Sequence, residues 1–361
     1  METALVLSAG FRLQYRTLQC CAPLFRAVHV FGTSAARDLS RSRLCTQFHE
    51  RPDPSGKAFG GRADVAAVQA LLASQRIDYL IPSDAETTRF LAEHRTAFDA
   101  KCYPVPAVVA FDQLDDKWRF AQLCGRIGVP HPETRLCATS DDVRSALAAA
   151  EAGAVFVVKP LALWGSSGVV KVTAADAAAV LAGVAYAPLL LQRYVPGPEF
   201  TTVVLCKGGR VKRAAHYRRR GSSVEFIDES EATRLAEIVA SHLRIDGILV
   251  FDIKRDPRGA LQVLECNPRF WYRMDVALRA GVNFVELGLW PRRFRRTARS
   301  PVRLERLDGL RTVLSRRLRG QPARFGDDAL LSAVARDPLV YALMAASRLL
   351  PSRRAAGGQQ L

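Results

Sequence analysis

The segment from residue 247 to residue 269 constrains the fold of this chain more than any other stretch. Two apolar runs, residues 248–253 and 261–264, flank a turn that contains Pro257 and Gly259. Apolar runs joined through Pro and Gly are typical of β-hairpins. We therefore expect two antiparallel strands here.

Four polar side chains follow the strands of this hairpin. Asp252 lies near the end of the first strand, and Glu265, Asn267 and Arg269 follow the second at alternate positions. Residues two apart on an extended chain point to the same face, so the four groups are expected to converge. Carboxylate and amide oxygens suit Mg²⁺, which binds through one or two carboxylates together with substrate phosphates, and Arg suits bidentate phosphate contact. A plain hairpin with solvated charges is the alternative.

A second pattern lies upstream, where an apolar strand ends in a lysine. Residues 155–158 lead into Lys159, and residues 169–172 form another strand-like run after a loop whose small residues are Gly165, Ser166, Ser167 and Gly168. Small residues allow backbone N–H groups to approach phosphate oxygens, and an ammonium adds a point charge. No Gly-Lys-Ser/Thr opens a helix here, so the loop is not a Walker loop. An ordinary hairpin turn is the alternative.

A third pattern is an apolar strand, residues 189–191, that runs into a rigid connector containing Pro196, Gly197 and Pro198. Such a connector can offer backbone donors and acceptors to a purine edge, and the acid that follows can bind ribose hydroxyls. A plain loop between strands is the alternative. The residues concerned are Gln192, Arg193, Tyr194, Val195 and Glu199.

Together and in this order, the three patterns resemble the ATP-grasp superfamily, and most closely its carboxylate–amine ligases. The resemblance spans residues 111–289 and adds a first phosphate lysine, Lys117. It implies an ATP site formed by Lys117, Lys159, Gly165, Ser166, Ser167, Gly168, Gln192, Arg193, Tyr194, Val195 and Glu199. It further implies Mg²⁺, or Mn²⁺ in its place, on Asp252, Glu265 and Asn267, with Arg269 as the catalytic residue.

Two positions depart from the pattern of the family. Gln192 begins the hinge, residues 192–195, at a position where many relatives have an acid. Tyr272, Arg273 and Met274 stand where smaller residues are usual. The second departure bears on the substrate more than on ATP.

The function that the resemblance implies is ligation of a small-molecule carboxylate to an amine through an acyl phosphate, with release of ADP and phosphate. An ATP-grasp small-molecule kinase, a nucleotide sensor without turnover and a basic nucleic-acid-binding protein are the alternatives. The acceptor site is open: Arg218, Arg219, Arg220, Trp271, Tyr272 and Arg273 either line it, or are surface charges and packing residues.

The expected fold class is α/β (α+β), an ATP-grasp fold. Residues 1–111 are predicted to form a Rossmann-like parallel α/β domain, because strand-like runs at 4–7, 28–31, 79–81 and 105–108 alternate with helical stretches at 62–74 and 86–98. Two ATP-clasping α+β subdomains are expected over 112–197 and 198–290. Ser83 and Asp84 follow a strand where open sheets bind ligands, but a helix N-cap is the favoured interpretation.

The eight cysteines show no C-x-x-C pair, which favours reduced thiols over a disulfide framework or zinc site. The apolar run at residues 4–9 is short, and Arg12 and Arg16 soon follow it, so we interpret it as a first strand and not a signal peptide. No run of about 18 apolar residues predicts a spanning helix. A cytoplasmic location is expected.

The formal net charge is +17, and residues 291–361 contribute 16 Arg against 5 acids, or +11. No aromatic-interleaved basic strand or zinc finger accompanies this charge, so we expect no specific nucleic-acid partner. The basic extension, residues 291–361, is predicted to be partly helical over 327–350, with a break at Pro338. Docking on the enzyme body is the favoured interpretation, and peripheral membrane contact is the alternative. The sequence does not predict an oligomeric state.

Overall fold

The structure is a computed structural model, and it describes residues 2–52, 59–161, 168–290 and 305–349. The chain divides into two compact units. Within the described residues, unit 1 draws on Met1–Phe111, Thr201–Val250 and Asn267–Pro351, and unit 2 draws on Asp112–Phe200 and Phe251–Cys266.

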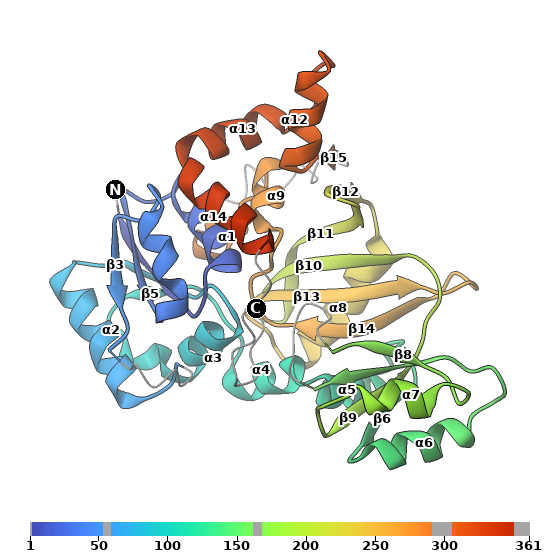
Figure 1. Cartoon of the computed structure of the whole chain (residues 1–361). Helices are drawn as coiled ribbons and strands as arrows, with labels where there is room; N and C mark the ends of the chain where they lie inside the picture. The colour runs from blue at the N-terminus through green and yellow to red at the C-terminus, as the bar shows by residue number, and fades with distance from the viewer. Residues whose placement is uncertain (1, 53–58, 162–167, 291–304, 350–361) are drawn as a thin grey trace. The chain divides into compact units, whose positions relative to one another are not determined.

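The first part of unit 1 is a parallel five-stranded sheet in the order β3-β2-β1-β4-β5. Its strands are β1 (Thr3–Ser8), β2 (Ala27–Gly32), β3 (Gln47–Glu50), β4 (Tyr79–Ile81) and β5 (Lys101–Cys102), and all pairs are parallel. The connecting helices are α1 (Arg12–Cys21), the 3₁₀ helix η1 (Ser34–Arg41), α2 (Arg62–Ser74), α3 (Ala85–His94) and the short 3₁₀ helix η2 (Arg95–Ala97). The predicted parallel α/β architecture is therefore confirmed (Figure 1).

One predicted strand of this sheet is wrong. Residues 105–108 do not form a strand; the fifth strand is β5, and Val108 begins helix α4 (Val108–Asp115). Pro104 directly precedes this segment and Pro106 lies within it, and proline has no N–H to donate to a sheet ladder. Tyr103 still donates its N–H to the carbonyl of Leu80 at 2.9 Å, where the pairing ends.

Asp84 serves as a helix cap, as the sequence favours. It is the N-cap of α3 and accepts from the N–H of Thr87 at 2.8 Å. The same carboxylate accepts from the N–H of Ala9 and from Nε2 of Gln14, each at 2.9 Å. Ser83 donates its hydroxyl to the carbonyl of Leu7 at 2.5 Å. Asp84 thus joins the ends of β1 and β4 to α1.

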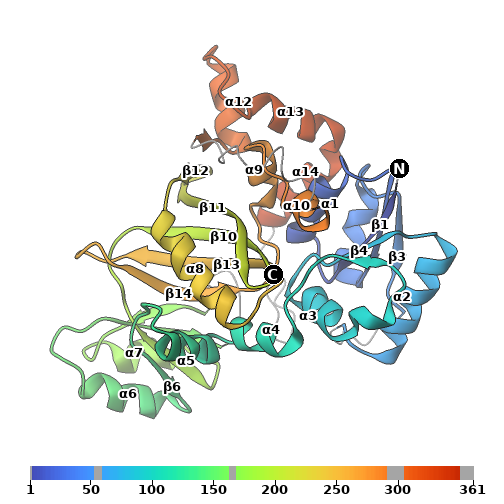
Figure 2. The same cartoon turned by 180° about the vertical axis from the view of Figure 1, so that it is seen from behind.

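A six-stranded sheet has the order β14-β13-β10-β11-β12-β15. Its strands are β10 (Glu199–Lys207), β11 (Arg210–Arg220), β12 (Ser223–Ile227), β13 (Gly247–Arg255), β14 (Leu261–Asn267) and β15 (Arg306–Leu307). Helix α8 (Ser230–His242) covers β11 on one face (Figure 2), and His216 of β11 contacts Thr202 and Thr233 there at 3.0 Å each. The predicted strands over residues 248–253 and 261–264 are present as β13 and β14, which neighbour each other.

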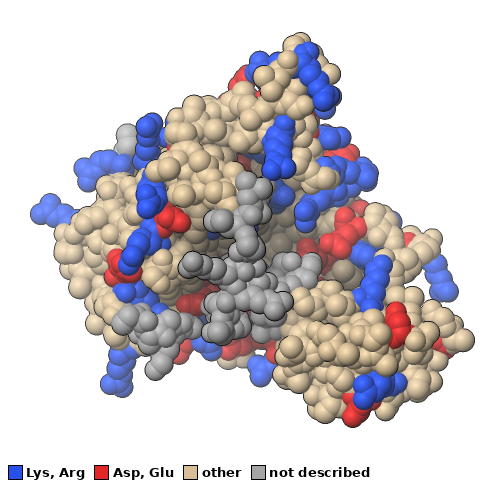
Figure 3. Space-filling view, viewed as in Figure 1, with Lys and Arg blue, Asp and Glu red and all other residues tan. Residues whose placement is uncertain are grey.

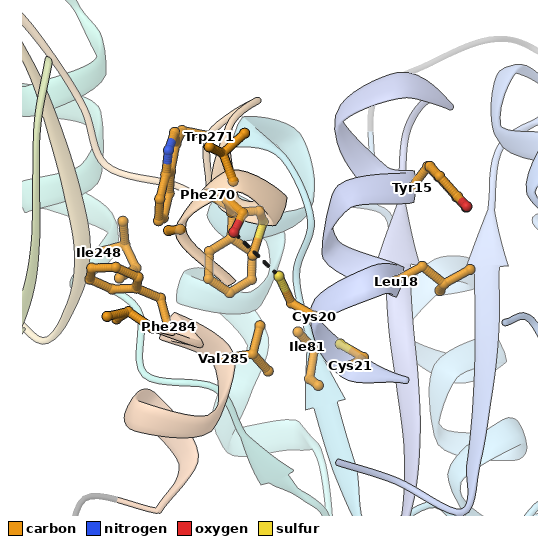
Figure 4. Close-up of a cluster of buried hydrophobic side chains, with 14 of the residues drawn as sticks. Tyr15, Leu18, Cys20, Cys21, Ile81, Ile248, Phe270, Trp271, Phe284 and Val285 are labelled. Atoms are coloured by element: carbon orange, nitrogen blue, oxygen red, sulfur yellow. Dashed lines mark hydrogen bonds between the residues drawn. The ribbon is translucent and has the colours of Figure 1, made fainter. Parts of the chain in front are cut away.

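The other face of unit 1's part of this sheet is apolar. Val203, Ala215, Tyr217, Ile248 and Val250 share one buried cluster with residues of the five-stranded sheet and of helices α9 (Met274–Arg279) and α10 (Phe284–Leu289). Figure 4 shows part of this cluster, in which Cys20 donates its thiol to the carbonyl of Met274 at 3.7 Å.

The basic extension begins outside the described residues and continues as α12 (Leu310–Leu318), α13 (Asp327–Arg336) and α14 (Pro338–Leu349). Helix α14 docks within unit 1: Val340 and Met344 are buried in the cluster just described, and Tyr341 accepts from Gln19 of α1 at 3.0 Å. The predicted break at Pro338 is confirmed by a 96° bend. Figure 3 shows basic side chains at the end of unit 1 that carries α12, a helix that contains arginine and no lysine.

No single helix among the described residues is long and apolar enough to cross a membrane, although α13 and the start of α14 pass that criterion as a bent pair.

Unit 2 holds an antiparallel four-stranded sheet in the order β6-β9-β7-β8. Its strands are β6 (Thr134–Cys137), β7 (Phe156–Pro160), β8 (Val170–Val172) and β9 (Leu189–Arg193). Helices α6 (Ser140–Ala148) and α7 (Ala177–Ala182) pack on it through Leu147 and Leu181, and α5 (Lys117–Ile127) precedes it (Figure 1).

Candidate functional site

Lys159 is the central cation of the candidate site in unit 2. It lies on β7 and is only 5% exposed. Its ammonium donates to Oε1 of Gln192 at 2.9 Å. Burial lowers the pKa of Lys159 to about 8, and the negative charges of Glu265 and Asp252 oppose part of that effect. A buried ammonium whose near partner is a neutral amide is well suited to receive an anion.

Lys117 brings a second ammonium to the same place. It is the first residue of α5, whose N-cap Asp116 accepts from the N–H of Arg119 at 2.9 Å. Its Nζ lies 3.9 Å from Oε2 of Glu265 and donates to the carbonyl of Leu161 at 3.4 Å. The positive charge of Lys117 also lowers the pKa of Lys159. The structure thus gathers Lys117, Lys159 and Glu265 within unit 2.

Gln192 is buried on β9 and joins two strands of its sheet. Its Oε1 accepts from Lys159 of β7, and its Nε2 donates to Oγ1 of Thr134 of β6 at 3.0 Å. An acid here would pair its charge with Lys159, whereas the amide makes both hydrogen bonds and leaves the ammonium uncompensated at this contact. The departure from the family's usual acid therefore has a direct electrostatic consequence.

In the rest of the hinge, residues 193–195, two backbone N–H groups and one side chain already have partners within the protein. The N–H groups of Arg193 and Tyr194 donate to the carbonyls of Glu133 and Val155 at 2.8 and 2.9 Å, and the guanidinium of Arg193 pairs with Glu151. The N–H of Val195, by contrast, has no hydrogen-bond partner within the described parts of the chain. It is the backbone donor of the hinge that remains for a ligand.

Two lysines that sequence reasoning missed flank the hinge tyrosine. The ammonium of Lys171 lies 3.9 Å from the centre of the Tyr194 ring, and that of Lys254 lies 4.7 Å from it. Lys254 also donates to the carbonyl of Val195 at 3.0 Å. A hydrogen bond from Lys171 and the charge of Lys254 lower the pKa of Tyr194.

Strand alternation could have found both lysines. Lys254 lies two residues after Asp252 on β13, and Lys171 pairs with Val157, which lies two residues before Lys159 on β7. Residues two apart on a strand share a face. Lys171 is exposed, and its ammonium contacts the ring of Tyr194.

The connector after the hinge is held against β13. Pro198 accepts from the N–H of Arg255 at 3.1 Å. Gly197 has φ +112°, and a Cβ there would overlap the carbonyl oxygen of Arg255. Only glycine fits that close approach without strain. Glu199, the first residue of β10, is exposed, and its charge acts on Lys159.

The candidate metal ligands lie on the β13–β14 pair. Asp252 and Glu265 are half-buried, and both act electrostatically on Lys159. Asn267 follows Glu265 by two residues on β14, so the two side chains share a face. Throughout the described residues, no group of three or more His, Cys, Asp or Glu could hold a metal ion. Two carboxylates and an amide suit Mg²⁺ only if other oxygens, such as phosphates, complete its coordination.

Arg269 turns back towards the amide of Asn267. Its Nη2 donates to Oδ1 of Asn267 at 2.9 Å, and its Nη1 donates to the carbonyl of Phe270 at 3.1 Å. Its guanidinium therefore lies beside one of the candidate metal ligands.

Of the predicted loop over the phosphates, Gly165, Ser166 and Ser167 lie outside the described residues. Gly168 ends this loop, and its carbonyl accepts from the hydroxyl of Tyr186 at 2.5 Å.

The structure separates the open acceptor candidates. Arg218 and Arg220 pair with Glu225 at 2.8 and 3.3 Å, whereas Arg219 does not. Trp271 is buried and packs edge-on against Phe284 with ring centres 5.1 Å apart, so packing accounts for its ring (Figure 4).

Comparison with known proteins identifies the fold. Residues 185–307 match a family described as ATP-grasp in the biosynthetic pathway with Ter operon. A search of curated proteins finds no match for the chain.

Among solved structures, the L-amino acid ligase from Bacillus licheniformis superposes with a TM-score of 0.60 at 16% identity, over 80% of this chain and 73% of that one. Biotin carboxylase from Campylobacter jejuni gives 0.60 at 17% identity, over 80% and 70%. N5-carboxyaminoimidazole synthase from Aspergillus clavatus, in complex with ADP and a ribonucleotide, gives 0.60 at 14% identity, over 80% and 77%. At these identities the likeness shows a shared fold.

Proposed function

We propose that this chain, of which residues 185–307 match an ATP-grasp family, is an ATP-dependent ligase that joins a carboxylate to an amine. The fold resembles that of an amino acid ligase, a biotin carboxylase and a ribonucleotide synthetase.

The observation that carries the proposal is the buried lysine beside a neutral glutamine. Lys159 is held at 2.9 Å from Gln192, with Lys117 close enough to lower its pKa further. Two ammonium groups lie near one buried point, and the hinge N–H of Val195 has no partner among the described residues. These groups match the phosphates and the purine edge of ATP. Such a charge is costly to bury without an anion, so phosphate binding would relieve a cost already present in the fold.

We assign the remaining roles from position. Val195 and the hinge backbone bind the purine, and Glu199 binds the ribose hydroxyls. Asp252, Glu265 and Asn267 would hold Mg²⁺, or Mn²⁺ in its place, which would neutralise charge on the β- and γ-phosphates. Arg269 lies beside Asn267, where its fork can contact two oxygens of the transferring phosphoryl group.

The reaction follows from the poor electrophilicity of a carboxylate. A carboxylate oxygen of the substrate attacks the γ-phosphorus, the bond to the β,γ-bridging oxygen breaks, and ADP leaves. The amine then attacks the carbonyl carbon of the acyl phosphate, phosphate leaves, and the nitrogen loses a proton. Positioning and charge stabilisation supply most of the catalysis in such a phosphoryl transfer, and Lys117, Lys159 and Arg269 are the groups that we assign to it.

The test is ADP release from ATP and Mg²⁺ with a panel of carboxylates, each with and without a panel of amines. Amine-dependent ADP release is the expected result. ADP release that needs no amine and yields a phosphorylated product would instead identify a kinase. Failure to bind ATP at all would reject the nucleotide site and with it the proposal.

A further inference from the structure

Unit 1 contains a cluster of arginines that the proposed chemistry does not use. Arg16 of α1 lies 3.3 Å from Asp275 of α9, and both side chains are 11% exposed. Burial lowers the pKa of Arg279 of α9, and the charges of Asp275, Arg16 and Arg273 also act on it. Burial likewise lowers the pKa of Arg273, on which the charges of Asp275 and Arg219 act. Among the described residues, Asp275 is the one carboxylate that acts on Arg16, Arg273 and Arg279 together.

Several buried polar atoms of this cluster have no hydrogen-bond partner in the described parts of the chain. They are Nε of Arg16, Nε of Arg279, Oδ1 of Asp275 and, two residues before Arg273, Nε1 of Trp271. Buried polar atoms are nearly always paired in native proteins. Unpaired donors beside an excess of positive charge indicate a place that an anion occupies.

Arg219 and Arg273 are the accessible members. Arg273 is half-buried and Arg219 is exposed, and neither guanidinium has a hydrogen-bond or ion-pair partner among the residues that the structure describes. The ring of Tyr272 lies 5.4 Å from the guanidinium carbon of Arg273. Two guanidiniums without carboxylates can bind an anion without first breaking an internal ion pair.

Strand alternation places Arg219 on the inner side of its sheet. Arg218 and Arg220 point together to Glu225, so Arg219 and Tyr217 lie on the opposite face of β11. Tyr217 is buried in the same cluster as Phe270 and Trp271. Arg219 thus shares a side with the segment that begins at Arg269, four residues before Arg273.

We propose that Arg219 and Arg273, with Arg16 and Arg279 behind them, bind an acceptor substrate that carries at least two negative charges. This inference rests on the proposed ligase function: one carboxylate of the acceptor is activated near Arg269, and the arginine cluster holds its second anionic group. The substrate class is a small dicarboxylic acid or a phosphorylated carboxylic acid. Arg forks recognise carboxylate and phosphate equally well in geometry.

The experiment measures binding of small acids to the full chain without nucleotide, at constant ionic strength. The probes are succinate, glutarate and citrate for the first class, phosphoglycolate for the second, and acetate and sulfate as controls. At least one multiply charged organic acid should bind about tenfold or more tightly than acetate or sulfate. The class of probe that binds shows whether the substrate is a dicarboxylic acid or a phosphorylated carboxylic acid.

Variants connect the binding to the cluster. Arg219→Gln and Arg273→Gln should each weaken binding of that acid about tenfold, the scale of one charge-assisted contact. Arg220→Gln is the matched control, because Arg220 is a neighbour on the same strand but pairs with Glu225, and it should change the affinity less than twofold. Binding of an ATP analogue should be the same in all three variants.

The inference and the proposed function fail in different ways. Equal binding of acetate and the multiply charged acids, no binding of any acid, or binding unaffected by Arg219→Gln would overturn the arginine site while ATP binding remained. Arg219 is exposed, so its variant decides the question even if Arg273→Gln does not fold. If the unmodified chain does not bind ATP, the ligase proposal is overturned instead.

Discussion

Replacing Lys159 by Met should make the free protein more stable while it weakens ATP binding. An ordinary lysine has a pKa of about 10.4, and burial lowers that of Lys159 to about 8. The difference corresponds to about 3 kcal/mol of unfolding free energy at neutral pH. Met would be free of that cost but would lose the hydrogen bond to Gln192, which offsets about 1 kcal/mol. A net gain of about 2 kcal/mol is therefore expected at pH 7.

The sign of the pH dependence follows from the same pKa. Below pH 8 the folded and unfolded states both carry the proton on Lys159, and the full cost of the buried charge is present. Between about pH 8 and pH 10.4 the folded state releases the proton while the unfolded state keeps it, so the unmodified protein gains stability relative to the variant. The advantage of Lys159→Met should shrink by about 3 kcal/mol across this range.

Urea unfolding of both proteins at pH 7, 8, 9 and 10 measures this difference, and titration of an ATP analogue measures affinity. ATP binding should weaken by roughly 1–3 kcal/mol, the scale of a lost charge-assisted contact. Lys212→Met is the matched control, because Lys212 is an exposed lysine on β11. A Lys159→Met variant that is less stable than the unmodified chain at pH 7, with a gap independent of pH, would refute the account of a buried uncompensated charge.

Three further substitutions test the site. Glu265→Gln should lower kcat at least about tenfold but leave the fold and much of the ATP affinity intact, because the glutamine side chain keeps the shape of glutamate and loses its metal-binding charge. Near-normal turnover at ordinary Mg²⁺ would contradict the assignment of Glu265 as a metal ligand. Arg269→Lys should lower kcat and kcat/KM together, since a lysine cannot span two phosphoryl oxygens; a lowered Tm with unchanged kcat would make Arg269 structural. Gly197→Ala should destabilise the protein by more than about 1 kcal/mol and weaken ATP binding, because the added Cβ would overlap the carbonyl oxygen of Arg255. If the variant bound ATP as tightly as the unmodified chain in a titration, the connector would not position the hinge.

The sequence predicts best where the signal is local. The β13–β14 pair follows from two apolar runs and a Pro/Gly turn, and the shared face of Glu265 and Asn267 follows from strand alternation. The cap role of Asp84 likewise depends on residues within one helical turn. Each of these inferences needs no knowledge of what packs against the segment.

Contacts between distant segments could not be predicted in the same way. The pairing of Lys159 with Gln192 joins residues 33 apart in the chain, and the Arg16–Asp275 pair joins α1 to α9. Nor does the run of three arginines at 218–220 show which member has a carboxylate partner; that depends on Glu225 of β12, across the strand from Arg218. The predicted strand at 105–108 failed because its valines suggested a strand, while Pro104 before them and Pro106 between them have no N–H to donate to a ladder.

The neutral hinge residue links these observations to function. With an acid at position 192, Lys159 would have a permanent counter-charge, and a nucleotide would have to compete with it. With Gln192 in this position, a 2.9 Å hydrogen bond orients Lys159 but supplies no negative charge, and burial therefore lowers the pKa of Lys159. Binding of phosphate oxygens would stabilise the protonated form and recover part of the burial cost. The fold would thus be less stable without nucleotide than with it, so part of the stability of this chain is expected to depend on ATP.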